Sequence, residues 1–166
     1  MKKERKITTV LLCIYLVIVT WIILFKMELS IASMPHYRGI NLIPFAGSLI
    51  VNGKIQVQEI VDNLIIFIPV GVFLSMLKSR WSFWEKVLPI FSLSLLYEVL
   101  QYVLAIGATD ITDVLSNTLG GIVGILIFGI FSKLLGDKTI KILNRIAIVC
   151  ILLVLGLMGV LIVVNL

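Results

Sequence analysis

The feature that most constrains this chain is a set of five long apolar segments. They cover residues 7–25, 60–77, 87–106, 114–132 and 146–166, which is more than half of the 166 residues. Three of them carry no charged side chain, and the other two carry one acid each, Asp62 and Glu98. A helix needs about 20 apolar residues to cross the roughly 30 Å of hydrocarbon in a bilayer. Each segment is therefore long enough for a membrane span.

The composition excludes the common soluble classes. The chain is 60% hydrophobic and only 14% charged, with a mean hydropathy of +1.17, whereas a soluble domain is about 45–50% apolar and a disordered chain has low hydrophobicity. A backbone in lipid must satisfy its hydrogen bonds internally. We therefore predict an all-α fold: one membrane domain over residues 1–166, a polytopic helical bundle of about five transmembrane helices.

Only the connection between the first two spans is long. Residues 39–51 within it form an apolar run that is too short to cross the bilayer, and Pro44 restricts the preceding residue to extended geometry. We predict an interfacial or re-entrant segment in this first outer loop, without a continuous helix. It is interpreted as a hydrophobic flap over the outer ends of the spans, with direct ligand contact as the alternative.

Basic residues are distributed unequally between the two sets of loops. One side holds only Lys26, Arg38 and Lys54, and the other side holds the remaining eleven. These eleven are Lys2, Lys3, Arg5, Lys6, Lys78, Arg80, Lys86, Lys133, Lys138, Lys141 and Arg145. Because short basic loops face the cytoplasm, we predict a cytoplasmic amino terminus and an extracellular carboxyl terminus. The pI of about 9.4 then reflects topology, and no nucleic-acid partner is expected.

The first apolar segment follows a basic cluster, which is also the pattern of a secretory signal. It is longer than the usual apolar core of such a signal, and no clear small-residue cleavage site follows it. An uncleaved membrane anchor is therefore the favoured interpretation.

Several small residues in the spans are explained by packing. Gly120 and Gly124 have the spacing that lets another helix approach closely, and we expect internal packing in preference to dimerisation. Cys13 and Cys150 are expected to be buried small hydrophobes, with no disulfide and no metal site. The last span has no interior charge and is expected to be a scaffold or lipid-facing helix.

Glu98 is the residue that is hardest to explain by structure alone. It lies 11 residues past Val87, which places it about 17 Å into the membrane at 1.5 Å per residue. An ionisable side chain at such depth costs at least about 2.5 kcal/mol and normally faces the bundle interior or a watery cavity. Gln101 follows at i+3 on the same helix face. Hydrogen bonding between helices is the purely structural alternative.

A second polar stripe begins the next span. Asp110, Asp113 and Asn117 have the spacing of one helix face. Capping of the helix by Thr109 or Asp110 explains an acid at the interface, but it does not explain the deeper Asn117. The short hairpin makes the two helices antiparallel neighbours. We therefore predict that both stripes converge in a polar cleft in the outer half of the membrane.

Four sequence blocks, taken together, resemble the VanZ-like family of bacterial membrane proteins. The resemblance extends over residues 40–124, and its order and spacing make it more specific than any single block. The blocks are residues 41–45 (NLIPF), Asn63 with residues 67–71 (FIPVG), residues 98–101 (EVLQ), and residues 110–113 (DITD) continued by residues 117–120 (NTLG). One departure is Gly107, where many members of the family have an arginine.

The resemblance implies a multi-pass protein of the bacterial cell membrane, in a family whose namesake is associated with low-level resistance to teicoplanin. It also adds two residues, Asn41 and Asn63, to the predicted cleft. The complete predicted set is Glu98, Gln101, Asp110, Asp113, Asn117, Asn63 and Asn41.

Two functions follow from these patterns. The favoured hypothesis is a non-catalytic envelope protein whose partners are membrane lipids and a lipid-linked cell-wall precursor or glycopeptide antibiotic. The alternative is a membrane enzyme acting on a lipid-linked intermediate, with Glu98, Asp110 and Asp113 as acid/base groups or ligands of a divalent cation. No catalytic residue, resident metal or cofactor is assigned. Against the enzyme, the chain offers no nucleophile and base pair beyond the carboxylates, because His36 is the only histidine and lies in the outer loop. A transporter is disfavoured because no internal repeat is evident.

Overall fold

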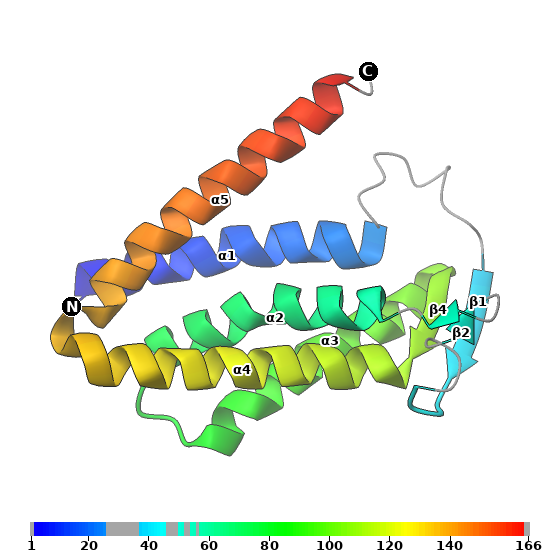
Figure 1. Ribbon diagram of the computed structural model, residues 1–166, viewed down its shortest axis with the longest axis horizontal. Helices are drawn as coiled ribbons and strands as arrows, with labels where there is room; N and C mark the ends of the chain where they lie inside the picture. Colours follow the sequence, from blue (N-terminus) through cyan, green and yellow to red (C-terminus); the bar gives the residue numbers. More distant parts are fainter. Residues whose placement is uncertain (1, 26–36, 46–49, 52–53, 56, 165–166) are drawn as a thin grey trace.

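A computed structural model describes residues 2–25, 37–45, 50–51, 54–55 and 57–164 of the chain. Long helices dominate it, and short strands lie at one end (Figure 1). The elements, in chain order, are α1 (Lys2–Phe25), β1 (Tyr37–Asn41), β2 (Ile50–Val51), β3 (Lys54–Ile55), α2 (Gln58–Leu77), α3 (Phe83–Leu104), β4 (Ile106–Asp110), α4 (Ile111–Leu135), the 3-10 turn η2 (Gly136–Lys138) and α5 (Thr139–Val164).

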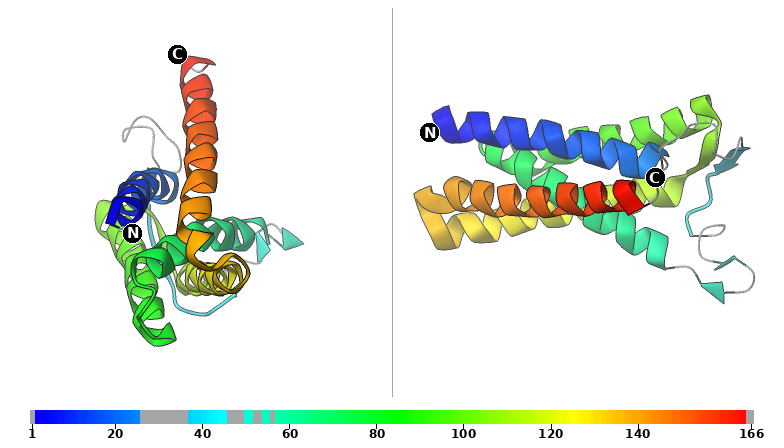
Figure 2. Two further views of the ribbon diagram at one scale, coloured as in Figure 1. Left: turned by 90° about the vertical axis from the view of Figure 1, so that its left-hand side faces the viewer. Right: turned by 90° about the horizontal axis from the view of Figure 1, so that it is seen from above.

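The helices are long and apolar enough to cross a membrane. This holds for α1, α2, α3 and the stretch Ile111–Val160. That stretch reverses direction at η2 and so contains two helices, α4 and α5 (Figure 1). The predicted helical membrane bundle is confirmed. Seen along the bundle, α5 projects away from the helices α2, α3 and α4 (Figure 2).

The bundle has two distinct ends. The amino terminus, the α2–α3 loop and the α4–α5 turn lie together at one end (Figure 1). Because the clustered Lys and Arg of the sequence fall in these segments or beside them, we call it the basic end. The opposite end carries β1 and β4 (Figure 1), and we call it the strand end.

The tightest helix pair is α2 with α4, which run in parallel. A Cβ atom at Gly120 would lie 2.1 Å from the carbonyl oxygen of Leu64, and one at Gly124 would lie 2.0 Å from that of Ile68. The two backbones therefore touch only because neither glycine has a side chain. The GxxxG spacing packs the chain internally, as expected from the sequence.

The first helix is joined to this pair by aromatic and polar contacts. The hydroxyl of Tyr15 in α1 donates to the carbonyl oxygen of Ile66 at 2.7 Å. The Thr20 and Tyr97 hydroxyls are 2.9 Å apart, which links α1 to α3. Tyr97 also meets Phe67 edge to face, with ring centroids 6.4 Å apart. Since lipid offers no hydrogen-bond partners, these hydroxyls can be buried only because each has a protein partner.

A polar lock fastens α5 to α1 near the basic end. Thr8 donates its hydroxyl to Oδ1 of the buried Asn144 at 2.9 Å. The amide nitrogen of Asn144 donates in turn to the backbone carbonyl of Glu4 at 3.1 Å and to its carboxylate at 3.0 Å. The last helix is thus tied to the first at its start, and the part beyond diverges from the bundle (Figure 2).

One sequence expectation, the burial of the two cysteines, differs from the structure. Cys13 and Cys150 are exposed on the surface of the bundle, so the prediction that they are buried was wrong. A small apolar thiol can lie on a surface that faces lipid without cost.

In the first outer loop, residues 37–41 form strand β1 and a turn follows as far as Phe45. Residues 46–49 of the expected flap, like His36, lie outside the described residues.

Candidate functional site

The strand end is organised by a parallel pair of short strands. β1 from the first outer loop pairs with β4 from the α3–α4 connection, so that Arg38 lies opposite Gly107 and Asn41 lies opposite Asp110. The pairing joins two segments that are nearly seventy residues apart in the sequence. A simple hairpin was expected at residues 107–113 from the sequence, because parallel pairing leaves no local pattern in either segment.

Glu98 fastens this strand pair to the membrane helices. Its side chain is 1% exposed, and its Oε2 atom accepts the backbone N–H of Asp110 at 2.7 Å. The hydroxyl of Thr109 donates to the backbone carbonyl of Glu98 at 2.9 Å. A buried carboxylate close to the strand end of α3 therefore holds the last residues of β4.

Asp110 has two structural roles at once. It is the N-cap of α4, because its Oδ1 atom accepts the backbone N–H of Thr112 at 2.7 Å. Its Oδ2 atom accepts the side-chain amide of Asn41 at 3.0 Å. The buried Thr112 extends the link, since its hydroxyl oxygen accepts the backbone N–H of Phe45 at 3.1 Å. Asn41, Asp110 and Glu98 thus form one chain of hydrogen bonds from the outer loop into the bundle.

Asn117 continues the polar contacts deeper between α3 and α4. It is 1% exposed, and its amide donates to the hydroxyl of Ser94 at 2.9 Å. Ser94 lies one helical turn before Glu98, and Asn117 lies one turn after Asp113. The two helices therefore carry stacked polar positions, as antiparallel neighbours should. Ser94 was missed by the sequence analysis, although its spacing of four residues from Glu98 was a usable signal.

Gln101 and Asn63 do not join this chain of hydrogen bonds. The Gln101 side chain is buried and donates to the carbonyl oxygen of Ile23 in α1 at 3.1 Å, so it braces a different pair of helices. Asn63 is half-buried on α2, and within the described residues no hydrogen bond connects it to the other predicted site residues. Helical spacing placed Gln101 on the face of Glu98, and the family resemblance added Asn63, but neither could identify which neighbour each side chain meets.

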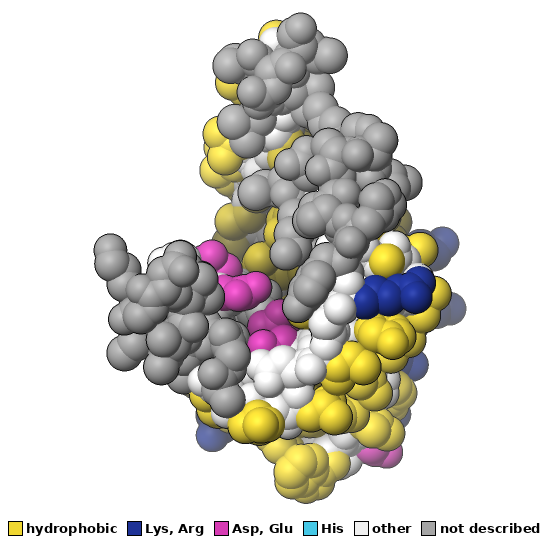
Figure 3. Space-filling model, turned by 90° about the vertical axis from the view of Figure 1, so that its right-hand side faces the viewer, with side chains coloured by type: hydrophobic (Ala, Val, Ile, Leu, Met, Phe, Trp, Pro, Cys, Tyr) yellow, Lys and Arg dark blue, Asp and Glu magenta, His cyan; other side chains and the backbone are white. Residues whose placement is uncertain are grey.

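Acidic charge is concentrated at the strand end. Asp110, Asp113 and Glu59 all lie near Glu98. Figure 3, which views the molecule from the strand end, shows acidic side chains gathered in a hollow, with a basic side chain toward one edge. Glu59, at the start of α2, was not among the predicted site residues. In the described part of the chain, no group of His, Cys, Asp and Glu has the arrangement of a metal site.

Arg38, on β1, is an exposed cation at the strand end. Its guanidinium carbon lies 5.7 Å from the centroid of the Tyr102 ring, and one of its nitrogens donates to the carbonyl oxygen of Val103 at 3.3 Å. Arg38 lies directly opposite Gly107 in the strand pair. The arginine expected at position 107 in the VanZ-like pattern therefore has a counterpart across the strands, which the sequence alone did not indicate.

Known proteins match most of the chain. Residues 12–132 match the family model described as VanZ/LLP1, a longer range than the 40–124 on which the resemblance was based. The curated "Protein VanZ" of Enterococcus faecium is 41% identical over 130 residues, which is 77% of each chain. No solved structure matches the chain.

Proposed function

The chain belongs to the VanZ/LLP1 family, and on that premise we propose that it lowers susceptibility to teicoplanin-type glycopeptides. It does so as a multi-pass protein of the bacterial cell envelope, without catalysis. The polar groups of the strand end alter how the drug, or a lipid-linked cell-wall intermediate, is held at the membrane surface. The family suggests the drug class, and the strand end offers the site.

The observation that carries this proposal is the hydrogen-bonded series Asn41, Asp110 and Glu98. It fixes a loop, a strand pair and two helix ends around a group of acids. A rigid acidic surface of this kind favours a ligand that brings hydrogen-bond donors or positive charge. Because the series is anchored in a buried carboxylate, the surface keeps its shape when the ligand is absent.

The proposed orientation places the strand end outside the cell. Eleven basic residues lie in or beside the segments of the basic end, and basic loops remain in the cytoplasm. The amino terminus is then cytoplasmic and the carboxyl terminus extracellular. This direction brings the acidic hollow to the side where glycopeptides and wall precursors meet the membrane.

The two carboxylates at the centre of the site favour binding over catalysis. Glu98 accepts the Asp110 N–H, and Asp110 uses both of its oxygens, one for the Thr112 N–H and one for Asn41. A general acid or base needs an atom within hydrogen-bond reach of the substrate. Since Oε2 of Glu98 and both oxygens of Asp110 hold the fold, these two side chains serve to shape a surface.

Expression in a susceptible host tests the proposal. The inhibitory concentration of teicoplanin and the binding of labelled drug to cells are measured with and without the protein, and no change in either would refute it. The variants Glu98→Gln, Asp110→Asn and Asp113→Asn, compared at equal membrane abundance, should weaken the phenotype. Asp137→Asn, an exposed acid in η2 at the basic end, is the matched control and should not.

The alternative, an enzyme acting on a lipid-linked intermediate, is favoured by the three acids near Glu98, which are Asp110, Asp113 and Glu59. It predicts that the lipid-precursor profile changes when the protein is expressed. It also predicts that the purified protein converts such lipids when Mg²⁺ is supplied. If the lipid-precursor profile is unchanged and the purified protein converts no such lipid, the enzyme hypothesis is refuted and the binding function stands.

A further inference from the structure

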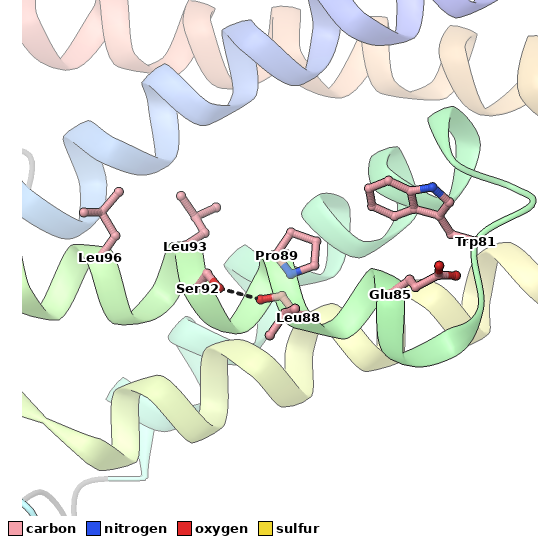
Figure 4. A pocket seen from close by; sticks show the side chains of 7 residues that line it. All are labelled: Trp81, Glu85, Leu88, Pro89, Ser92, Leu93 and Leu96. Atoms are coloured by element: carbon pink, nitrogen blue, oxygen red, sulfur yellow. Dashed lines mark hydrogen bonds between the residues drawn. The ribbon is translucent and has the colours of Figure 1, made fainter.

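A second candidate site lies on α3 near the basic end, away from the acids. An open groove of about 670 Å³ runs along the first half of the helix. Figure 4 shows Trp81, Pro89, Leu93 and Leu96 pointing to the same side of α3. The groove is lined by Trp81, Glu85, Leu88, Pro89, Ser92, Leu93 and Leu96 (Figure 4).

The floor of the groove is apolar along most of its length. Ser92 contributes a hydroxyl, but this group already donates to the carbonyl oxygen of Leu88 at 2.9 Å (Figure 4). Pro89 offers no backbone N–H and only a compact ring. From Glu85 to Leu96 the helix rises about 16 Å, close to half of the roughly 30 Å hydrocarbon thickness. This length matches an acyl chain in one leaflet.

Positive charge lies at the end of the groove that is marked by Trp81. The Lys78 ammonium is 4.8 Å from the centroid of the Trp81 ring. Arg80 precedes Trp81 in the chain and is exposed, and Lys86 is half-buried in the first turn of α3. Among the described residues, none of these three cations forms an ion pair.

Glu85, the one acid that lines the groove, already has a hydrogen-bond partner. The Glu85 carboxylate accepts the backbone N–H of Ser82 at 2.6 Å, which closes a capping box at the start of α3. Because the three cations outnumber this acid, the net charge is positive where a lipid headgroup would lie.

We propose that this groove binds one anionic phospholipid, with an acyl chain along Leu88, Leu93 and Leu96 and the headgroup phosphate beside Lys78, Arg80 and Lys86. Juxtamembrane Lys and Arg attract anionic lipids, and a tryptophan beside them sits at headgroup level. The site does not depend on the proposed glycopeptide function, because it lies at the opposite end of the bundle.

Quenching of Trp81 fluorescence by brominated lipids tests the site. The chain has three tryptophans, so Trp21→Phe with Trp84→Phe leaves Trp81 as the only emitter. The full-length protein is placed in phosphatidylcholine vesicles that contain the same mole fraction of brominated phosphatidylglycerol or brominated phosphatidylcholine. We expect the anionic lipid to quench several times more strongly, and equal quenching overturns the proposal.

Three further variants separate a specific site from general electrostatic attraction. Lys78→Gln with Arg80→Gln and Lys86→Gln should lower the preference by about fivefold for each cation removed. Lys133→Gln with Lys138→Gln and Lys141→Gln removes as many charges from the α4–α5 turn at the same end, and should leave the preference unchanged. Ser92→Phe, with helicity checked by circular dichroism, fills the groove and should abolish it. An equal loss in the turn variant, or none in Ser92→Phe, refutes a groove-bound lipid.

Discussion

The strand end and the basic end both bury polar groups, but these groups connect different things. At the strand end, the carboxylates of Glu98 and Asp110 accept backbone N–H groups at 2.7 Å, so they order loops and strands. At the basic end, Asn144 joins two helices through Thr8 and Glu4. Buried hydrogen bonds can therefore either shape a surface or fasten helices, and those of the strand end lie near two further acids, Asp113 and Glu59.

Separating α2 from α4 should have the largest effect, because both ends depend on this pair. In Gly124→Ala the new Cβ would lie 2.0 Å from the carbonyl oxygen of Ile68, so the helices must move apart. We expect a loss of about 1–3 kcal/mol or more, measured by thermal unfolding in detergent with circular dichroism.

The matched control for this change is Gly129→Ala in the same helix. No atom lies within 4 Å of a Cβ atom at that position, and alanine favours helix over glycine by up to about 1 kcal/mol. Stability should stay the same or rise. An equal loss in both variants would show that the close contact between the helices is not the cause.

Removing the anchor of the strand end should have the next largest effect. In Glu98→Ala the backbone N–H of Asp110 loses its acceptor, and a buried unsatisfied donor costs about 1–3 kcal/mol. The loss should be local, so amide hydrogen exchange should accelerate in residues 106–110 and stay unchanged in α1. Glu98→Gln keeps an acceptor oxygen and should lose less. Faster exchange at both ends would contradict the separation drawn between them.

Breaking the lock at the basic end should have a smaller effect. Asn144→Leu removes hydrogen bonds between α1 and α5, and such bonds in membranes contribute about 0.6 kcal/mol on average and about 1.7 at most. Two quantities are measured, thermal stability and the inhibitory concentration of teicoplanin. Thermal stability should fall slightly, and the inhibitory concentration should not change at equal membrane abundance. The exposed neighbour Arg145→Gln is the control and should alter neither. Loss of the drug phenotype in Asn144→Leu would show that the two ends are coupled.

The sequence was sufficient for those features that depend on local chemistry. Continuous apolar runs predicted the spans, and Asp110 was correctly expected as a possible helix cap because capping needs only nearby backbone groups. The parallel pairing of β1 with β4 was not predictable, since its two partners are far apart and carry no shared pattern. Gln101 shows the same limit within a helix. Its polar face was evident, but its partner, the Ile23 carbonyl, depends on how α1 packs.

Moving the arginine from position 38 on β1 to position 107 on β4 should have the smallest effect on stability. Arg38→Gln removes the stacking on Tyr102 and the bond to the Val103 carbonyl, and an exposed cation–π contact contributes about 0.5–1 kcal/mol. Gly107 lies directly opposite, and a Cβ atom there would meet nothing closer than Gln101 at 4.0 Å. Adding Gly107→Arg to Arg38→Gln should therefore restore stability in thermal unfolding, whereas Gly107→Gln, a side chain without charge, should not. If both double variants behave alike, a positive charge at this position does not contribute to the stability of the strand end.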